Sequence, residues 1–545
     1  MKRLTALFLT LSFVASVPAV SAQSAAPAVY TAPKETIDRI KEEGMSRSQV
    51  MQTLSYMTDV IGGRLTGSPN MKRANEWTRD KMKEWGMQNE HLEMWGPFGR
   101  GWSLRKFSAN IVEPHYVPVN AYPAAWSPST KGAVNSEVVF LDAKDDSDLA
   151  KYKGKLREKI VLVSGERPLK PIDQSLTTRL SNEQLAKMAA APAPAAEGDD
   201  PPPAMLKNIT EHFNSQAKRL KFLIDEGASV MIENSNQGSG GTSFVQGASV
   251  GVEMKELKSF DDLFNSPAFQ PQIKKWESSM MPQVTVASED YNRLVRMIRN
   301  GVTPKMSIEI DAQFYEEDPN GYNTIAEIPG SDPKLKDEVV MLGGHLDSWH
   351  SSTGATDNAA GCAAVMEAAR IILASGLKPR RTIRVALWSG EEQGLFGSTA
   401  YVKKHFGEMK NDSLVKAADY DKLSAYYNLD NGTGRIRGVY MQGNSGVRPF
   451  FEAWLAPFAD VGAKTLTLAN TGGTDHLPFD AIGLPGFQFI QDPVEYNTRT
   501  HHSNQDNYDR IQADDMKQAS TIIAAFAYQT AMMDEKLPRK SKPLP

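Results

Sequence analysis

The 545-residue sequence contains a single cysteine, Cys362, so no disulfide can form within one chain. Core packing or a bound metal must therefore supply the stability that many exported proteins obtain from disulfides. Cys362 begins the stretch CAAVMEAARII, in which apolar residues recur at helical spacing. This pattern predicts a buried, unreactive thiol that packs as a small hydrophobic group rather than a nucleophile.

The sequence also lacks a run of basic residues, and its formal net charge is −4. This acidic balance argues against nucleic acid or an anionic membrane surface as a partner. Beyond the N-terminal segment, no run approaches the ~18 apolar residues that a membrane-spanning helix needs. We see no internal repeat. We therefore expect no nucleic acid and, once the N-terminal segment is removed, no membrane among the partners.

The first 22 residues, MKRLTALFLTLSFVASVPAVSA, have the three parts of a secretory signal peptide. Positions 2 and 3 are basic, positions 4–17 are mostly apolar, and Val20-Ser21-Ala22 fits the small-residue rule for cleavage. The alternative is an N-terminal membrane anchor. We expect cleavage after Ala22 and a periplasmic or secreted protein.

The length predicts two or three domains. Helical and loop-rich patterns cover residues 34–93, with the glycine-rich turn IGGRLTGSPN among them. Strand and helix signals then alternate from about 130 to 312, around a low-complexity excursion at 189–204 that cannot build a core. We expect a discontinuous domain of residues 23–129 and 313–535, an inserted domain at 130–312 and a tail at 536–545.

From residue 321 onward, short apolar strands alternate with helices. The strand candidates are EVVMLGG, TIRVALWSGEE, LSAYYNLDN and LPGFQFIQD; the helix candidates are DNAAGCAAVMEAARIILASG and ADDMKQASTIIAAFAYQTAMM, the second predicted to be amphipathic. This alternation predicts an α/β fold with a largely parallel sheet covered on both faces. In such sheets, ligands bind at the carboxyl ends of the strands.

Side chains that can ligate a metal follow these strands. They are His345, Asp347, Asp357, Glu391, Glu392, Asp430, His501 and His502. Imidazole and carboxylate ligands are typical of zinc, and two zinc ions about 3.5–4 Å apart need a carboxylate that bridges them. Zinc lowers the pKa of a water molecule from 15.7 to about 7, and a nearby carboxylate then moves the proton to the leaving amine.

Each candidate taken alone has a simpler explanation. Asp357 can cap the following helix, Asp430 can be a turn residue, and the acidic pair at 391–392 can be solvated charge. Their joint occurrence at strand ends favours a metal centre. Because side chains alternate along an extended chain, one member of the acidic pair can face the metal and the other the water. Asp347 can support His345 or neighbouring ligands from behind.

These motifs together resemble the cocatalytic dizinc aminopeptidase family, which includes bacterial leucyl aminopeptidases and plasma glutamate carboxypeptidase. The matching stretches are GGHLDS, GATDNAAGCAAVMEAAR, WSGEEQGLFGSTAYV, NLDN, TDHLPFDAIGLPGF and HHSNQD, and IGGRLTGSPN matches the family's opening segment. The resemblance implies a zinc exopeptidase fold with a mixed, mostly parallel central sheet and helices on both faces. Residues 130–312 resemble a β-rich α/β protease-associated domain, which implies an insertion that shapes or covers the cleft.

The resemblance also implies two Zn²⁺ per chain. One zinc would be held by His345, Asp357 and Asp430, and the other by Asp357, Glu392 and His502, with Asp357 as the bridge. His501 is the alternative to His502. In the same way, the resemblance makes Glu391 the general acid/base and Asp347 the support of the ligands.

Three further residues are weaker candidates. Many family members place a tyrosine near the scissile carbonyl, where this chain has glycines at 472 and 473, so Tyr496 is a substitute candidate. Asp475 and His476 lie in a family motif near the substrate pocket.

We therefore expect an exported zinc-dependent exopeptidase that acts on peptides or dipeptides through a water activated by a glutamate base. One alternative is a single-zinc acyl transferase of the glutaminyl cyclase type, which would not need His345 and Asp430 together. Another is a receptor-like homologue without catalysis, as in the transferrin receptor ectodomain. Such proteins lose ligands, and we identify no missing ligand in this sequence.

Overall fold

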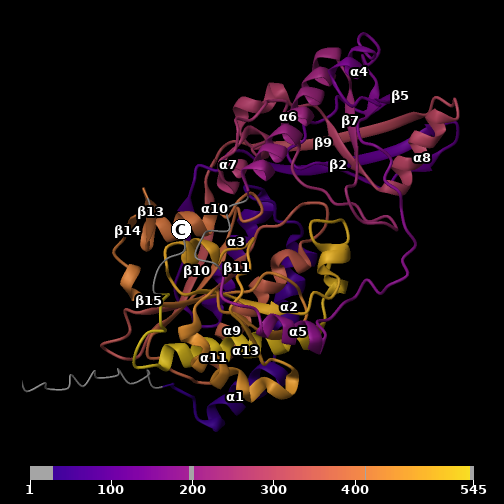
Figure 1. The fold of residues 1–545 in the computed structure, drawn as a ribbon. Helices are drawn as coiled ribbons and strands as arrows, with labels where there is room; N and C mark the ends of the chain where they lie inside the picture. Colours follow the sequence, from indigo (N-terminus) through magenta and orange to yellow (C-terminus); the bar gives the residue numbers. More distant parts are fainter. Residues whose placement is uncertain (1–28, 195–201, 412, 541–545) are drawn as a thin grey trace, which may run out of the picture.

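The computed structural model describes residues 29–194, 202–411 and 413–540. The expected signal peptide lies outside the described residues, as do the middle of the low-complexity segment and the last five residues of the expected tail. Two eight-stranded sheets organise the described chain, one in each of the two lobes seen in Figure 1.

The first sheet has the strand order β1-β10-β12-β11-β15-β18-β16-β17. Its strands are β1 (Gln88–Trp95), β10 (Gly321–Ile328), β11 (Val339–His345), β12 (Thr382–Trp388), β15 (Leu423–Asn428), β16 (Ile436–Tyr440), β17 (Thr465–Thr467) and β18 (Gly486–Gln491). The central strands β12, β11, β15 and β18 run parallel, whereas β1 and β10 pair antiparallel with their neighbours. β16 pairs antiparallel with β18 and parallel with β17. The predicted mixed, mostly parallel sheet is confirmed at its centre.

Helices cover both faces of this sheet, as predicted. On one face, α9 (Ala360–Ala374) and α13 (Ala513–Met532) pack against alternate residues such as Val340 and Leu342. On the other, α10 (Phe396–His405) and α12 (Leu477–Ala481) pack against Met341 and its neighbours. The helices α1 (Lys34–Ser46), α2 (Val50–Ser55), α3 (Pro69–Glu84) and α11 (Arg448–Leu455) complete this lobe, with the hairpin β13 (Gly407–Lys410) and β14 (Ser413–Lys416).

Two local predictions for this lobe are wrong. The helix α13 is not amphipathic: almost every residue from Asp515 to Ala531 is buried, because α1, α9 and the sheet surround it. A helix that is apolar on nearly all sides is typical of such a core position. Residues 88–95 belong to β1 rather than to helix or loop, because their mostly polar side chains suit an edge strand beside β10.

The second sheet has the order β3-β2-β9-β5-β6-β7-β8-β4. Its strands are β2 (Gly101–Glu113), β3 (Val117–Pro118), β4 (Ala121–Pro123), β5 (Val134–Phe140), β6 (Ile160–Leu162), β7 (Val230–Asn234), β8 (Gln283–Val286) and β9 (Lys305–Tyr315). Its helices are α4 (Asp146–Ala150), α6 (Pro203–Glu226), α7 (Phe260–Phe264) and α8 (Ser288–Arg299), and α6 and α8 pack on opposite faces.

This sheet begins before the expected boundary at residue 130. The long strands β2 and β9 pair from Gly101 with Tyr315 to Glu113 with Lys305, so residues 101–129 share the second sheet instead of the first. We propose that the inserted unit spans residues 101–315.

One segment of the inserted unit leaves its own sheet and docks on the first lobe, where α5 (Asn182–Ala189) packs beside β17 (Figure 1). Thr178 and Val494 exchange backbone hydrogen bonds of 2.9 Å. Arg179 pairs with the buried carboxylates of Asp492 at 3.0 Å and Asp515 at 2.7 Å. These contacts anchor the chain just before the loop that carries the two neighbouring histidines.

A substitution at Gly361, near the start of α9, can test how tightly this framework is packed. A Cβ atom on Gly361 would lie 2.2 Å from the carbonyl oxygen of Leu429, so the backbone would have to shift. We expect Gly361→Ala to lower the free energy of unfolding by about 1–3 kcal/mol, the usual cost of overpacking. Thermal denaturation measures this change. Gly165→Ala is the control, because nothing lies within 4 Å of a Cβ there; equal melting temperatures for the two variants would contradict the packing argument.

Candidate metal centre

The fold brings the predicted ligands to one edge of the first sheet. His345 is the last residue of β11, Glu392 follows β12, and Asp430 follows β15. These strands are parallel neighbours, so their carboxyl ends meet at the same edge. Asp357 lies in the turn before α9, and His502 comes from the loop after β18.

Asp357 lies at the centre of this group. Its Oδ1 atom is 3.2 Å from Nε2 of His345, and its Oδ2 atom is 3.2 Å from Nε2 of His502. Nε2 of His345 is also 3.4 Å from Oδ1 of Asp430, and Nε2 of His502 is 2.9 Å from Oε2 of Glu392. Asp357 is only 4% exposed. Its carboxylate therefore offers one oxygen to each imidazole, as a bridging ligand would.

The polar atoms of this cluster lack the hydrogen-bond donors that buried acceptors require. His345 Nε2, Asp357 Oδ2, Glu392 Oε1 and Asp430 Oδ1 are buried, and none has a well-aligned hydrogen-bond partner. Leaving such atoms unpaired is costly, whereas a cation would satisfy them. Three overlapping groups of these side chains place their ligand atoms within 4.8 Å of one another: His345–Glu391–Asp430, His345–Asp357–Glu392 and Asp357–His501–His502. The residues present therefore fit a metal ion.

The two neighbouring histidines differ in their contacts. Nε2 of His501 is 3.8 Å from Asp357, and no ion pair joins it to Glu392, whereas His502 lies close to both carboxylates. His502 also adopts a left-handed backbone conformation with φ of 56°, which non-glycine residues rarely occupy. The geometry favours His502 over His501 as the ligand.

Burial and neighbouring charges shift the pKa values of the carboxylates in the cluster. Burial, with the charge of Asp357 beside it, raises the pKa of Glu392 to about 7. Burial, with the charges of Asp430 and Asp475, also raises the pKa of Glu391 well above its ordinary range. Although burial opposes it, the imidazoles of His345 and His502 keep the pKa of Asp357 well below the usual value. Carboxylates packed this closely favour the binding of a cation.

Asp347 supports the acidic pair from behind. Its Oδ1 and Oδ2 atoms accept backbone N–H bonds of 3.3 Å from Glu391 and Glu392, respectively, and Oδ2 also accepts a bond of 2.9 Å from the hydroxyl of Thr66. Its carbonyl oxygen lies 3.0 Å from Nδ1 of His345. Asp347 is fully buried, so it fixes the backbone of the acidic pair and the ring of His345 from behind the cluster.

The structure adds two supporting residues that the sequence reasoning missed. Asp506 accepts backbone N–H bonds from Thr356 at 2.6 Å and from Asp357 at 3.1 Å, and burial raises its pKa to about 7. Arg64 is fully buried and donates to the carbonyl oxygens of residues 346, 353 and 354. Both residues lie inside quoted family motifs, which were the only available signal for them.

The inserted unit also reaches the site. Nε2 of Gln246 lies 3.0 Å from Nδ1 of His502, and the backbone N–H of Val245 donates to the His502 carbonyl at 3.0 Å. Asn504 donates its backbone N–H to the carbonyl of Ser243 at 3.0 Å. The turn at 243–246 therefore holds the loop of His502 in place. No sequence signal predicted this contact. Residues 243–246 form no recognisable motif, and about half the length of the chain separates them from the histidines.

The remaining candidates occupy different places. The hydroxyl of Tyr496 donates to Oδ1 of Asp357 at 3.1 Å, so this tyrosine borders the cluster. Asp475 is buried near it, and burial raises its pKa to about 8. His476 instead pairs with the carbonyl of Thr471 at 3.0 Å. As predicted, Cys362 is fully buried, and burial raises the pKa of its thiol to about 12.

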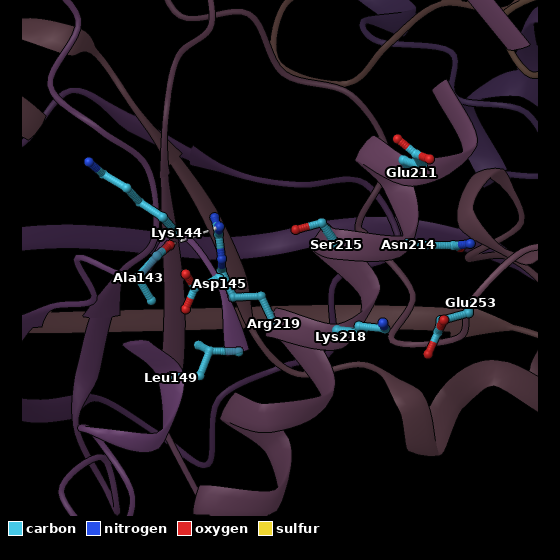
Figure 2. Close-up of a pocket in the computed structure, with 10 residues that line it drawn as sticks. All are labelled: Ala143, Lys144, Asp145, Leu149, Glu211, Asn214, Ser215, Lys218, Arg219 and Glu253. Carbon is cyan, nitrogen blue, oxygen red and sulfur yellow. Dashed lines mark hydrogen bonds between the residues drawn. The ribbon is translucent and has the colours of Figure 1, made fainter. Parts of the chain in front are cut away.

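A separate hollow of about 300 Å³ lies in the inserted unit (Figure 2). It is lined by both acidic and basic side chains, among them Lys144, Glu211, Lys218 and Glu253. Arg219 points across it and donates to the carbonyls of Ala143 and Val163. None of its lining residues belongs to the metal-ligand groups, so it is distinct from the candidate centre.

Comparison with known proteins places this geometry in a family. Residues 323–527 match the model of Peptidase family M28. Human carboxypeptidase Q is 26% identical over 526 residues, which cover 93% of this chain and 94% of the relative. Leupeptin-inactivating enzyme 1 of Streptomyces exfoliatus is 34% identical over 174 residues, or 32% of this chain and 36% of that protein.

Solved structures show the same fold. A peptidase M28 precursor from Shewanella amazonensis SB2B superposes with a TM-score of 0.61 at 22% identity, covering 93% of this chain and 99% of the other. BSAP, a zinc aminopeptidase from Bacillus subtilis, has a TM-score of 0.53 at 18% identity, with 91% and 96% covered. The resemblance carried by the motifs is thus confirmed: residues 323–527 match peptidase family M28, and the chain is a peptide hydrolase.

Proposed function

We propose that this chain is an exported zinc-dependent exopeptidase that removes N-terminal residues from peptides or splits dipeptides. The main support is the position of Asp357, whose two carboxylate oxygens each lie 3.2 Å from a different imidazole. Zinc suits a site built from imidazole and carboxylate ligands. The likeness to a Bacillus subtilis zinc aminopeptidase agrees with this choice of metal.

Two Zn²⁺ would share this cluster. His345, Asp357 and Asp430 would hold one ion, and Asp357, Glu392 and His502 would hold the other. The contact of 2.9 Å between Glu392 and His502 supports the second set. Glu391 has fewer contacts, with its Oε2 atom 3.8 Å from Nε2 of His345, which leaves its carboxylate available for proton transfer.

Zinc, when bound, supplies a Lewis acid that polarises the peptide carbonyl and lowers the pKa of a water molecule. The residues of the chain then perform the proton transfers. Glu391 takes a proton from the attacking water and gives it to the nitrogen of the breaking peptide bond. Asp347 keeps Glu391 in position because its carboxylate accepts a hydrogen bond from the backbone N–H of Glu391. Tyr496, which donates to Asp357, lies where its hydroxyl borders the reacting groups.

The expected location remains the periplasm or the extracellular medium, and the expected partner is a peptide or dipeptide. Among the described residues, no helix is both long and apolar enough to cross a membrane. The single-zinc cyclase alternative would leave part of the cluster unused, because His345 and Asp430 lie 3.4 Å apart beside the bridging Asp357.

Removal of the metal tests the proposed centre. Chelation should abolish hydrolysis of aminoacyl amides and dipeptides, and added zinc should restore it, with about two ions per chain by elemental analysis, as a two-metal site requires. Zinc should also raise the melting temperature, because a ligand at 1,000 times its Kd stabilises a protein by about 4 kcal/mol. About one zinc per chain together with pyroglutamate formation would favour the cyclase instead.

The two adjacent glutamates should differ in their effects. We expect Glu391→Gln to retain zinc but lower kcat by roughly 10²–10⁴-fold, the usual contribution of a general base. Glu392→Gln should instead lose zinc, because its carboxylate contacts His502. Steady-state kinetics and metal content together separate these roles. Normal turnover by the Glu391 variant would overturn the assignment.

A substitution of Asp506 can test whether this residue holds Asp357 in position. Asp506→Asn removes the charge that accepts the N–H bonds of Thr356 and Asp357, so the bridging carboxylate should lose its fixed position. We expect zinc affinity to fall roughly 10–100-fold, as is typical for outer-shell substitutions. Competition with a chelator measures the affinity. The matched control is the exposed Asp509, and an equal affinity for Asp506→Asn and Asp509→Asn would contradict the role of Asp506.

A further inference from the structure

A cavity of about 520 Å³ joins the candidate metal centre to the inserted unit. Glu392, Gln393, His502 and Trp349 line it from the first lobe. The inserted unit contributes the other walls, which include residues of α6, β7, β8 and α7. The cavity is therefore built from both lobes and borders two of the proposed zinc ligands.

Two side chains at the metal end of the cavity have unused hydrogen-bonding groups. Gln393 is only 5% exposed, and neither its amide nitrogen nor its amide oxygen has a hydrogen-bond partner. The indole N–H of Trp349 is also buried and unpaired. Buried amides are normally satisfied, so these groups indicate a ligand that brings its own donor and acceptor. A peptide group has both.

The inserted unit also contributes aromatic side chains to the lining, among many polar ones. The aromatic ones include Trp126, Phe213, Phe244, Phe264 and Phe269. Aromatic side chains suit a long apolar side-chain stem, and their faces also attract a cation. The lining thus favours a long side chain over a small one.

Glu233 lines the same cavity from β7. No described residue forms a salt bridge or hydrogen bond with its side chain. The charge of Arg219 lowers the pKa of Glu233, but the guanidinium of Arg219 donates its hydrogen bonds to the carbonyls of Val163 and Ala143. Burial raises the pKa of Glu233. Glu233 is half-buried, and a carboxylate without a partner is stabilised when a cation enters beside it.

We propose that this cavity selects substrates with a cationic side chain, lysine or arginine, whose main chain bonds to Gln393 while its charged end pairs with Glu233. The inference rests on the proposed peptidase function and names its substrate class. The inserted unit would then set specificity as well as hold the loop of His502.

The test compares arginine with citrulline, which has nearly the same shape and no charge. Zinc-loaded enzyme is assayed on peptide pairs that carry either residue on each side of the scissile bond in turn. We expect kcat/KM to favour arginine by roughly 10–100-fold at one of these positions, because a hydrogen bond to a charged group contributes about 1.5–3 kcal/mol. Glu233→Gln should reduce this ratio to about one, and Glu233→Lys should invert it.

Two further variants complete the design. Glu253→Gln removes an exposed carboxylate of the inserted unit outside the cavity and should leave the ratio unchanged. Gln393→Ala should lower kcat/KM for both peptides of a pair about equally, because it contacts the main chain. A wild-type ratio near one, or a preference for arginine that survives Glu233→Gln, would overturn the proposal.

Calorimetry separates this proposal from the proposed function. Zinc-loaded Glu391→Gln enzyme should bind the arginine peptide more tightly than the citrulline peptide, by the same factor, without turnover. If no peptide is cleaved by the wild-type enzyme but this binding difference persists, the peptidase function fails and the cavity assignment stands. If neutral and cationic peptides are both cleaved and bind equally, the cavity assignment fails alone.

Discussion

Several carboxylates share one buried space, and the rest of the structure depends on this electrostatic constraint. Asp357, Glu392, Asp430 and Asp475 are all at most slightly exposed and lie close to two imidazoles. Without a compensating charge, such a group is costly, and the raised pKa values of Glu392 and Asp475 express that cost. A folded chain keeps this arrangement most easily when divalent cations occupy it.

Much of the surrounding structure holds these charges in place. Parallel strands bring His345 and Asp430 to one sheet edge, and Asp347 and Asp506 fix neighbouring backbone amides through charge-assisted hydrogen bonds. The left-handed conformation of His502 costs about 1–3 kcal/mol for a non-glycine residue. The contact of Val245 with its carbonyl, together with the docking of Arg179 before the same loop, stabilises that conformation from the inserted unit.

The sequence was informative where local pattern and chemistry coincide. Apolar strands that lead to His345, the acidic pair and Asp430 predicted both the parallel centre of the sheet and the edge where the proposed ligands gather. Local pattern failed where tertiary contacts decide. β1 is mostly polar and forms a strand only because β10 offers an edge, and the surroundings of α13 rather than its spacing determine its burial. Gln246 could not be foreseen, because nothing in its neighbourhood indicates a distant histidine.

The early start of the inserted unit has a mechanical consequence. Because β2 and β9 pair along nearly their whole length, they form a ribbon whose ends at Gly101 and Tyr315 both join the first lobe. Two connections restrict rotation of the unit more than a single linker would. The turn at 243–246 can then meet the loop of His502 with the precision that a hydrogen bond to an imidazole demands. The shape of the cavity and the position of this proposed ligand would therefore be coupled, because Gln246 and His502 both line the cavity and contact each other.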